Sequence, residues 1–89
     1  MDMTLIKDVL VRIENGQHSF SVLPADSAAA LGIEPETKLT RQEAKNLEDH
    51  LNLLEERGLI KIMFRSGGGN YAIDGLTLQG RDFLRQLKG

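Results

Sequence analysis

The chain contains no cysteine, no tryptophan and few aromatic residues of any kind. The absence of cysteine excludes disulfides and thiolate metal sites as supports for the fold. No apolar run approaches the roughly 20 residues that a helix needs to span a bilayer. Stability must therefore come from one apolar core, or from such a core assisted by self-association.

The chain also lacks a strong charge of either sign, because its formal net charge is −2. This balance argues against strong non-specific binding of nucleic acid, which depends on Lys and Arg neutralising phosphates, but it leaves room for a local basic patch. With 89 residues, 40% of them hydrophobic, the chain has the composition of one globular domain, residues 1–89. Its first residues lack the basic and apolar segments of a secretory signal, so we expect a soluble, cytoplasmic protein.

Apolar residues at helical spacing predict a helix over residues 2–15. Asn15 and Gly16 are expected to end it, because both tolerate positive φ. Apolar and polar residues then alternate over 17–23, which predicts a short strand that Pro24 ends. The apolar face of the predicted helix consists of Leu5, Ile6, Val9, Leu10 and Ile13.

The segment 25–31 is rich in alanine and opens with Asp26 and Ser27, which are both good N-cap residues. It is predicted to form a short second helix, and residues 32–39 are predicted to form a loop.

The clearest helix begins at Thr40, which forms a capping box with Glu43 three residues later. The pattern predicts a helix over 40–57, with Gly58 as its left-handed C-cap. The residues expected on its buried face are Ala44, Leu47, Leu51 and Leu54.

Two strand-like runs follow, Ile60–Arg65 and Tyr71–Asp74, with a glycine-rich stretch between them. This pattern predicts a β-hairpin whose tip is Ser66–Asn70. A last helix is predicted over 77–88, with Thr77 as its cap. Its expected inward residues are Gly80, Phe83, Leu84 and Leu87.

The order of these elements predicts an α+β fold, a winged helix-turn-helix with a small three-stranded antiparallel sheet. The strand at 17–23 is expected to pair with the hairpin and to remove one of its free edges. The apolar faces of the first three helices and of the sheet are expected to close one core.

Three stretches, residues 3–10, 50–60 and 76–84, resemble the corresponding parts of small bacterial winged-helix proteins of unassigned function, often found in phages and prophages. The most specific of them is the closing pattern Leu-Thr-x-x-Gly-x-x-Phe-Leu. This chain departs from that pattern at Leu78 and Arg81, where many members have Trp and His, and its link over 24–39 is longer. The resemblance implies a winged-helix fold and a regulatory role, without an established activity.

The helix at 40–57 occupies the position of a recognition helix, whose N-terminal residues read base edges in the major groove. Arg suits guanine, and Gln or Asn suits adenine. The predicted nucleic-acid contacts are Arg41, Gln42, Lys45 and Asn46, with support from Arg65 at the wing. The acidic residues of the same helix leave a plain solvated face as the alternative.

Other polar groups carry weaker signals. The glycine-rich tip precedes a strand, whereas phosphate-binding glycine loops precede a helix, so a hairpin turn is the better interpretation. Arg81, Arg85 and Lys88 form a possible phosphate-facing patch or simply offset the helix dipole. Of the two histidines, His50 is expected at the surface or half-buried, and neither has the further ligands that a zinc site needs.

The sequence therefore predicts no enzyme, no metal site and no cofactor, because no set of reactive groups is visible. The first hypothesis is a transcription-regulator-like protein that binds double-stranded DNA. The alternative is a winged-helix module that binds a protein partner without DNA. The first helix is apolar enough to serve a homodimer interface as well as the core.

Overall fold

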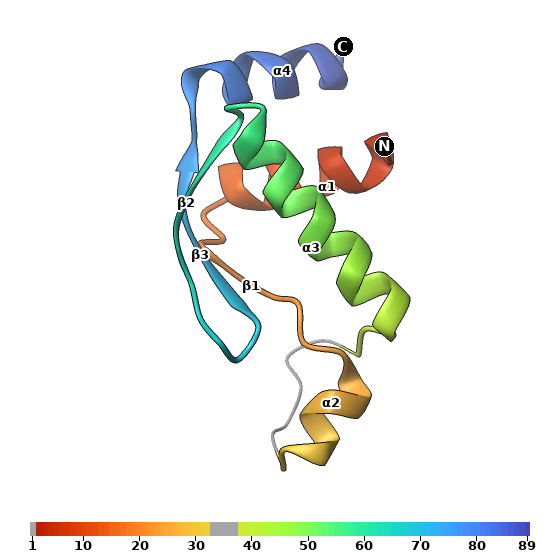
Figure 1. Cartoon of the computed structure of the whole chain (residues 1–89). Helices are drawn as coiled ribbons and strands as arrows, with labels where there is room; N and C mark the ends of the chain where they lie inside the picture. The colour runs from red at the N-terminus through yellow and green to blue at the C-terminus, as the bar shows by residue number, and fades with distance from the viewer. Residues whose placement is uncertain (1, 33–37) are drawn as a thin grey trace.

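The computed structural model describes residues 2–32 and 38–89. Within these residues the chain forms four helices and one three-stranded sheet, an α+β arrangement (Figure 1). Every predicted helix and strand is present, although β1 is shorter and β3 longer than expected, and the predicted loop at 32–39 lies largely outside the described residues. The elements are α1 Met3–Glu14, β1 Ser19–Ser21, α2 Ala25–Ala30, α3 Arg41–Glu56, β2 Ile60–Arg65, β3 Asn70–Leu76 and α4 Leu78–Lys88.

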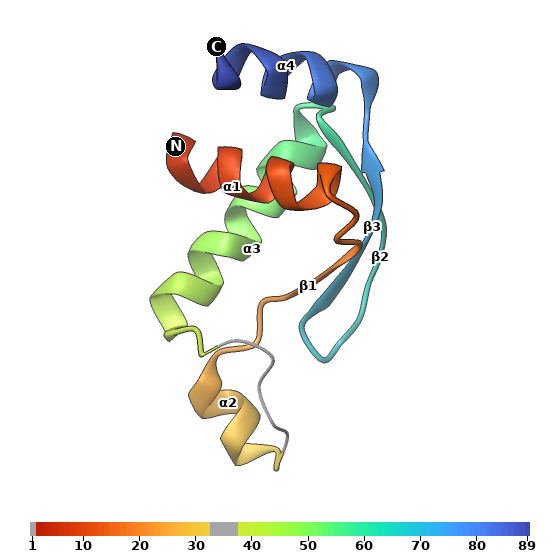
Figure 2. The same ribbon diagram turned by 180° about the vertical axis from the view of Figure 1, so that it is seen from behind.

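The sheet has the strand order β1-β3-β2, and both pairs of strands are antiparallel. The predicted hairpin of β2 and β3 and the predicted pairing of β1 with it are both confirmed. α1 and α3 lie on one side of the sheet, and no helix of the described residues covers the other side (Figure 1, Figure 2). The sheet therefore has one buried face and one open face.

The core lies between the covered face of the sheet and the helices α1, α3 and α4. The Asp2 side chain caps α1 by accepting a hydrogen bond from the Leu5 amide, and the predicted apolar face of α1 packs inward. Gly16 and Gly58 both have positive φ after α1 and α3, as predicted for the helix ends. The largest fully buried side chains are Ile6, Val9, Leu10, Leu51, Leu54, Ile60, Ile73 and Leu84.

The edge strand β2 is irregular. Met63 has no partner in the register with β3, and the strand pairing shifts on both sides of Ile62. The alternation of buried and exposed residues therefore breaks, which leaves Met63 and its neighbour Phe64 63% and 60% exposed. The Ile62 amide is occupied by a side chain, because it donates to Glu55 Oε2. A bulge and a blocked amide both make this edge a poor template for another strand.

The start of α4 docks onto the turn that joins α3 to β2. Thr77 caps α4 by accepting from the Gly80 amide, and its hydroxyl donates to the Gly58 carbonyl. The Thr77 amide donates to the Leu59 carbonyl at 3.1 Å. Gly80 lies so close that an added Cβ would overlap the Leu59 carbonyl oxygen. The Thr and the Gly of the closing pattern noted in the sequence are therefore explained by this contact, Thr77 through its hydrogen bonds and Gly80 through its close packing.

The short helix α2 does not contribute to this core. It extends away from the rest of the chain, beyond the N-terminus of α3 (Figure 1, Figure 2). Its one buried residue, Ala28, lies outside the core cluster, and Leu31 after it is 64% exposed. The prediction that the first three helices share one core is wrong for α2, because its alanines offer too little apolar surface to bury.

We expect Gly80→Ala to lower the free energy of unfolding by about 2 kcal/mol or more. The overlap with backbone that is held by hydrogen bonds outweighs the better helix propensity of alanine, which is worth about 1 kcal/mol. Urea denaturation followed by circular dichroism measures the change. The control is Gly67→Ala, where an added Cβ meets nothing within 4 Å. Equal stability of both variants would contradict this close packing.

Candidate nucleic-acid interface

The first turns of α3 lie at the same end of the molecule as the tip of the β2–β3 hairpin (Figure 1). The predicted capping box is confirmed, since Thr40 Oγ1 accepts from the Glu43 amide and Glu43 Oε1 accepts from the Thr40 amide. The box fixes where α3 begins and so fixes which side chains its first two turns present.

The hairpin tip is held against the chain that follows β1. The Val22 amide donates to the Gly69 carbonyl at 2.7 Å, and the Ser66 amide donates to the Asn70 carbonyl at 2.8 Å. Gly69 has φ +83, and an added Cβ would lie 3.4 Å from Leu23. The tip is therefore a hairpin turn, as predicted, and it is held beside the chain that follows β1. It carries no lysine or arginine of its own.

A shallow groove of about 310 Å³ runs between the start of α3 and the chain after β1. Two of the predicted contacts, Arg41 and Lys45, lie along it, one helical turn apart. Glu48, one turn further, places a carboxylate in the same groove. The lining consists of Val22, Pro24, Arg41, Ala44, Lys45 and Glu48.

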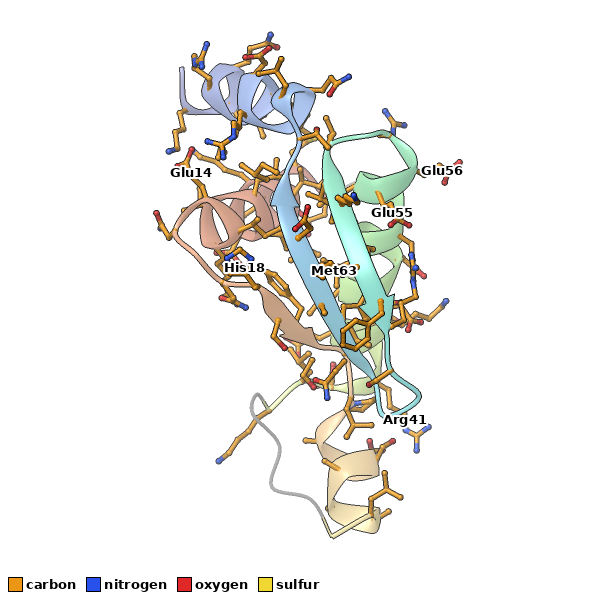
Figure 3. All side chains as sticks on the ribbon, turned by 90° about the vertical axis from the view of Figure 1, so that its left-hand side faces the viewer. Glu14, His18, Arg41, Glu55, Glu56 and Met63 are labelled. Atoms are coloured by element: carbon orange, nitrogen blue, oxygen red, sulfur yellow. The ribbon has the colours of Figure 1, made fainter. Side chains whose placement is uncertain are left out.

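Each of these two cations already has an anionic partner. Arg41 Nε lies 2.6 Å from Asp26 Oδ2 on α2, and Lys45 Nζ lies 3.5 Å from Asp49 Oδ2. All four side chains are more than half exposed, so these pairs exchange with solvent at little cost. Figure 3 shows Arg41 at the hairpin end of the molecule, above α2.

The other two predicted residues of α3 lie apart from this groove. Gln42 is exposed at the first turn. Asn46 is half-buried and lines a different hollow, one that faces α1 and includes Asp2 and Leu5. Helical geometry explains the split, because Arg41 and Lys45 are four residues apart and share a face, whereas Asn46 follows directly and points away from them.

Arg65, the predicted wing contact, lies in a polar network between β2 and α3. Its Nη2 donates to Asn52 Oδ1 at 2.7 Å and to Glu55 Oε1 at 2.8 Å. Its guanidinium also lies 5.4 Å from the centre of the Tyr71 ring. The hydrogen bond to Glu55 raises the pKa of Arg65 above its ordinary value. Arg65 therefore connects the hairpin to α3.

The same network includes four residues to which sequence reasoning gave no role in a site, namely Glu48, Asn52, Glu55 and Tyr71. Asn52 Nδ2 donates to Tyr71 Oη at 3.1 Å, and Tyr71 Oη donates to Glu48 Oε2 at 3.3 Å. Glu48, Asn52 and Glu55 are spaced four and three residues apart, so one face of α3 carries all of them. That spacing was a signal available in the sequence, but only the sheet shows what the face meets.

His50 is buried, with 8% of its surface exposed, so the prediction of a surface or half-buried residue is wrong. Its Nδ1 donates to the Asn46 carbonyl at 2.7 Å, and its Nε2 accepts from the Asp2 amide at 3.0 Å. A carbonyl only accepts and an amide only donates, so these bonds require the neutral ring with its proton on Nδ1. His50 thus ties the start of α1 to α3.

The cations of α4 form a separate group at the far end of the molecule. Lys88 Nζ lies 2.7 Å from Glu14 Oε1 on α1, and Arg85 lies 3.6 Å from Asp82. These two cations belong to the last turn of α4, where positive charge offsets the helix dipole. Glu14 shares a hollow of about 290 Å³ with Arg81, Arg85 and Lys88.

Within residues 2–32 and 38–89, no three His, Asp or Glu side chains lie close enough together to hold a metal ion. No helix there is both long and apolar enough to pass through a bilayer.

We expect Arg65→Lys to lower the free energy of unfolding by roughly 0.5–1 kcal/mol, because lysine keeps the charge but cannot reach Asn52 and Glu55 together. Urea denaturation provides the measurement. The exposed Arg81 is the matched control, and Arg81→Lys is expected to leave stability unchanged. A neutral effect of Arg65→Lys would show that the network adds nothing to the fold.

The Asp26 carboxyl is held in its charged form by Arg41, because the hydrogen bond from Arg41 lowers the pKa of Asp26. A lowered pKa means that the Asp26–Arg41 contact is fully present above the ordinary aspartate pKa and is lost as pH falls through the folded value. Carboxyl NMR titration should give Asp26 a pKa below that of an unpaired aspartate, and Arg41→Ala should return it to the ordinary range. An unchanged value in Arg41→Ala would contradict the pair.

Comparisons with known proteins place the chain in one family. No curated protein matches the chain, and no solved structure matches it. The model of one family matches residues 1–89, and its description reads "Hypothetical protein (DUF2513)". The chain therefore belongs to this family of uncharacterised proteins.

Proposed function

We propose that this chain is a winged-helix protein that binds double-stranded DNA through the first two turns of α3. The observation that supports the proposal is the common position of those turns and the hairpin tip at one end of the molecule (Figure 1). A recognition helix beside a hairpin is the arrangement by which winged-helix proteins approach a duplex.

In this proposal the start of α3 enters the major groove. Arg41 at the first helical position contacts guanine or a phosphate, and Gln42 beside it contacts adenine. Lys45 lies one helical turn after Arg41, in the same groove of the protein, and contacts a phosphate of the DNA backbone. Arg65 has a positioning role, because it holds the hairpin against α3 through Asn52 and Glu55. Asn46 has no DNA contact in this proposal.

The ion pairs at this end determine how strong the binding can be. A phosphate must take Arg41 from Asp26 and Lys45 from Asp49. Few lysine or arginine side chains at this end are then free to neutralise phosphates and so to release counterions from the DNA. We therefore expect a modest affinity for DNA that falls with added salt. Asp26 lies on α2, which gives that helix a definite role in the proposal, namely to hold Arg41 until a duplex replaces the carboxylate.

We expect Asp26→Asn to tighten binding to a duplex by roughly two- to fivefold, because Arg41 then no longer has to leave an exposed carboxylate partner when it contacts the duplex. Arg41→Ala is expected to weaken binding by about tenfold and to reduce the salt dependence by about one phosphate contact. Fluorescence anisotropy with a random duplex pool at low salt measures both.

Asp82→Asn is the matched control for this experiment. It removes the same charge from α4, where Asp82 pairs with Arg85. Net charge therefore changes equally in Asp26→Asn and Asp82→Asn, and only the first variant changes the proposed interface. Equal effects of the two would indicate non-specific attraction, and absence of binding to any duplex at micromolar protein would end the proposal.

A second candidate function is a module that binds a protein partner with the same end of the molecule. The pairing of Arg41 and Lys45 with carboxylates favours it, because such a surface presents both signs of charge. Affinity purification from nuclease-treated extract of the native host tests it. Recovery of one partner that Arg41→Ala and Asp26→Asn both lose would support this function over DNA binding.

A further inference from the structure

An apolar hollow of about 460 Å³ lies at the opposite end of α3 from the proposed interface. It is bounded by the start of α1, the end of α3 and the middle of α4. The ribbon views show α1, α4 and the end of α3 at this end of the molecule (Figure 1, Figure 2). Its volume falls in the range of small-molecule sites. The lining residues are Met3, Ile6, Leu54, Arg57, Leu59 and Phe83.

The hollow has a rigid floor and an open rim. Ile6 and Leu54 form the floor and are each 1% exposed. Leu59 and Phe83 are half-buried walls, and Met3 at the rim is 39% exposed. The floor is part of the core, so the shape of the hollow follows from the fold and is present without a ligand.

Arg57 is the one charged residue of this lining. It is exposed, and within residues 2–32 and 38–89 its side chain takes part in no ion pair. Six other cations do have carboxylate partners there, namely Arg12, Arg41, Lys45, Arg65, Arg85 and Lys88. An unpaired guanidinium beside an apolar hollow complements a ligand with an anionic head and an apolar body.

We propose that this hollow binds a small aliphatic carboxylic acid, with the alkyl chain between Met3, Leu59 and Phe83 and the carboxylate on Arg57. A carboxylate matches the planar fork of arginine, and an unbranched chain matches a hollow open at one side. The site lies away from the groove at Arg41, so this proposal is independent of DNA binding.

The test follows the methionine methyl groups of the full chain by NMR during titration with hexanoate, octanoate and decanoate below their micelle concentrations. Met3 lines the hollow, whereas Met63 is an exposed apolar residue on β2 that does not line it. The Met3 signal should shift saturably while the Met63 signal stays in place. Binding should tighten by up to about fourfold for each added methylene until the chain fills the hollow.

Two pairs of variants, followed through backbone amide signals, separate head-group recognition from apolar contact. Arg57→Gln should weaken octanoate binding by about tenfold, because a charge-assisted hydrogen bond is lost, and Arg81→Gln should leave it unchanged. Met3→Glu should abolish binding by placing a carboxylate at the rim, and Met63→Glu should not. Octan-1-ol should bind about as weakly to the native chain as octanoate binds to Arg57→Gln.

Three results would overturn the proposal. Parallel, non-saturating shifts of Met3 and Met63 would show general adsorption of the alkyl chain. Equal binding of octanoate and octan-1-ol would remove the role of Arg57. Sedimentation that shows a dimer lost in Met3→Glu and unaffected by octanoate would show that a second copy of the chain occupies the hollow.

Discussion

The contact between the end of α3 and the start of α4 determines where the remaining elements lie. Thr77 joins the two segments by hydrogen bonds to the carbonyls of Gly58 and Leu59, and Gly80 allows the backbones to approach without a side chain between them. β2 begins directly after this turn and β3 ends directly before Thr77. This contact therefore fixes the start of β2 and the end of β3, and it brings α4 over the core.

Polar side chains between α3 and the β2–β3 hairpin hold these two elements together. Glu55 accepts from Arg65 with one oxygen and from the Ile62 amide with the other. The same carboxylate thus holds the hairpin to the helix and blocks an edge amide. Because these groups are partly exposed, the network adds little to stability, and its main effect is to fix the distance between the helix and the hairpin tip.

Electrostatics at the two ends of α3 differ, and the two proposals follow from that difference. At the start of the helix, Arg41 and Lys45 are held by exposed carboxylates, which an incoming phosphate can replace. At its end, Arg57 lies beside an apolar hollow and has no ion-pair partner among the described residues. The first arrangement suits a polyanion that competes for several cations, and the second suits a single anionic group attached to an apolar chain.

The sequence by itself determined the helices and strands and the apolar faces of α1, α3 and α4, but it misjudged α2 and the burial of His50. The signals that it contains are local ones: the capping box at Thr40, the positive-φ glycines at 16 and 58, and the helical spacing of aliphatic residues. Such signals depend only on neighbouring residues, so they can be recognised without the tertiary structure. The sequence also indicated the hairpin and the inward position of Gly80. Tertiary structure alone decided the long-range pairings: Asp26 with Arg41, Arg65 with Asn52 and Glu55, and His50 with Asp2. These contacts join residues far apart along the chain, whose distances follow from how the elements pack, and no pattern within one element records that packing.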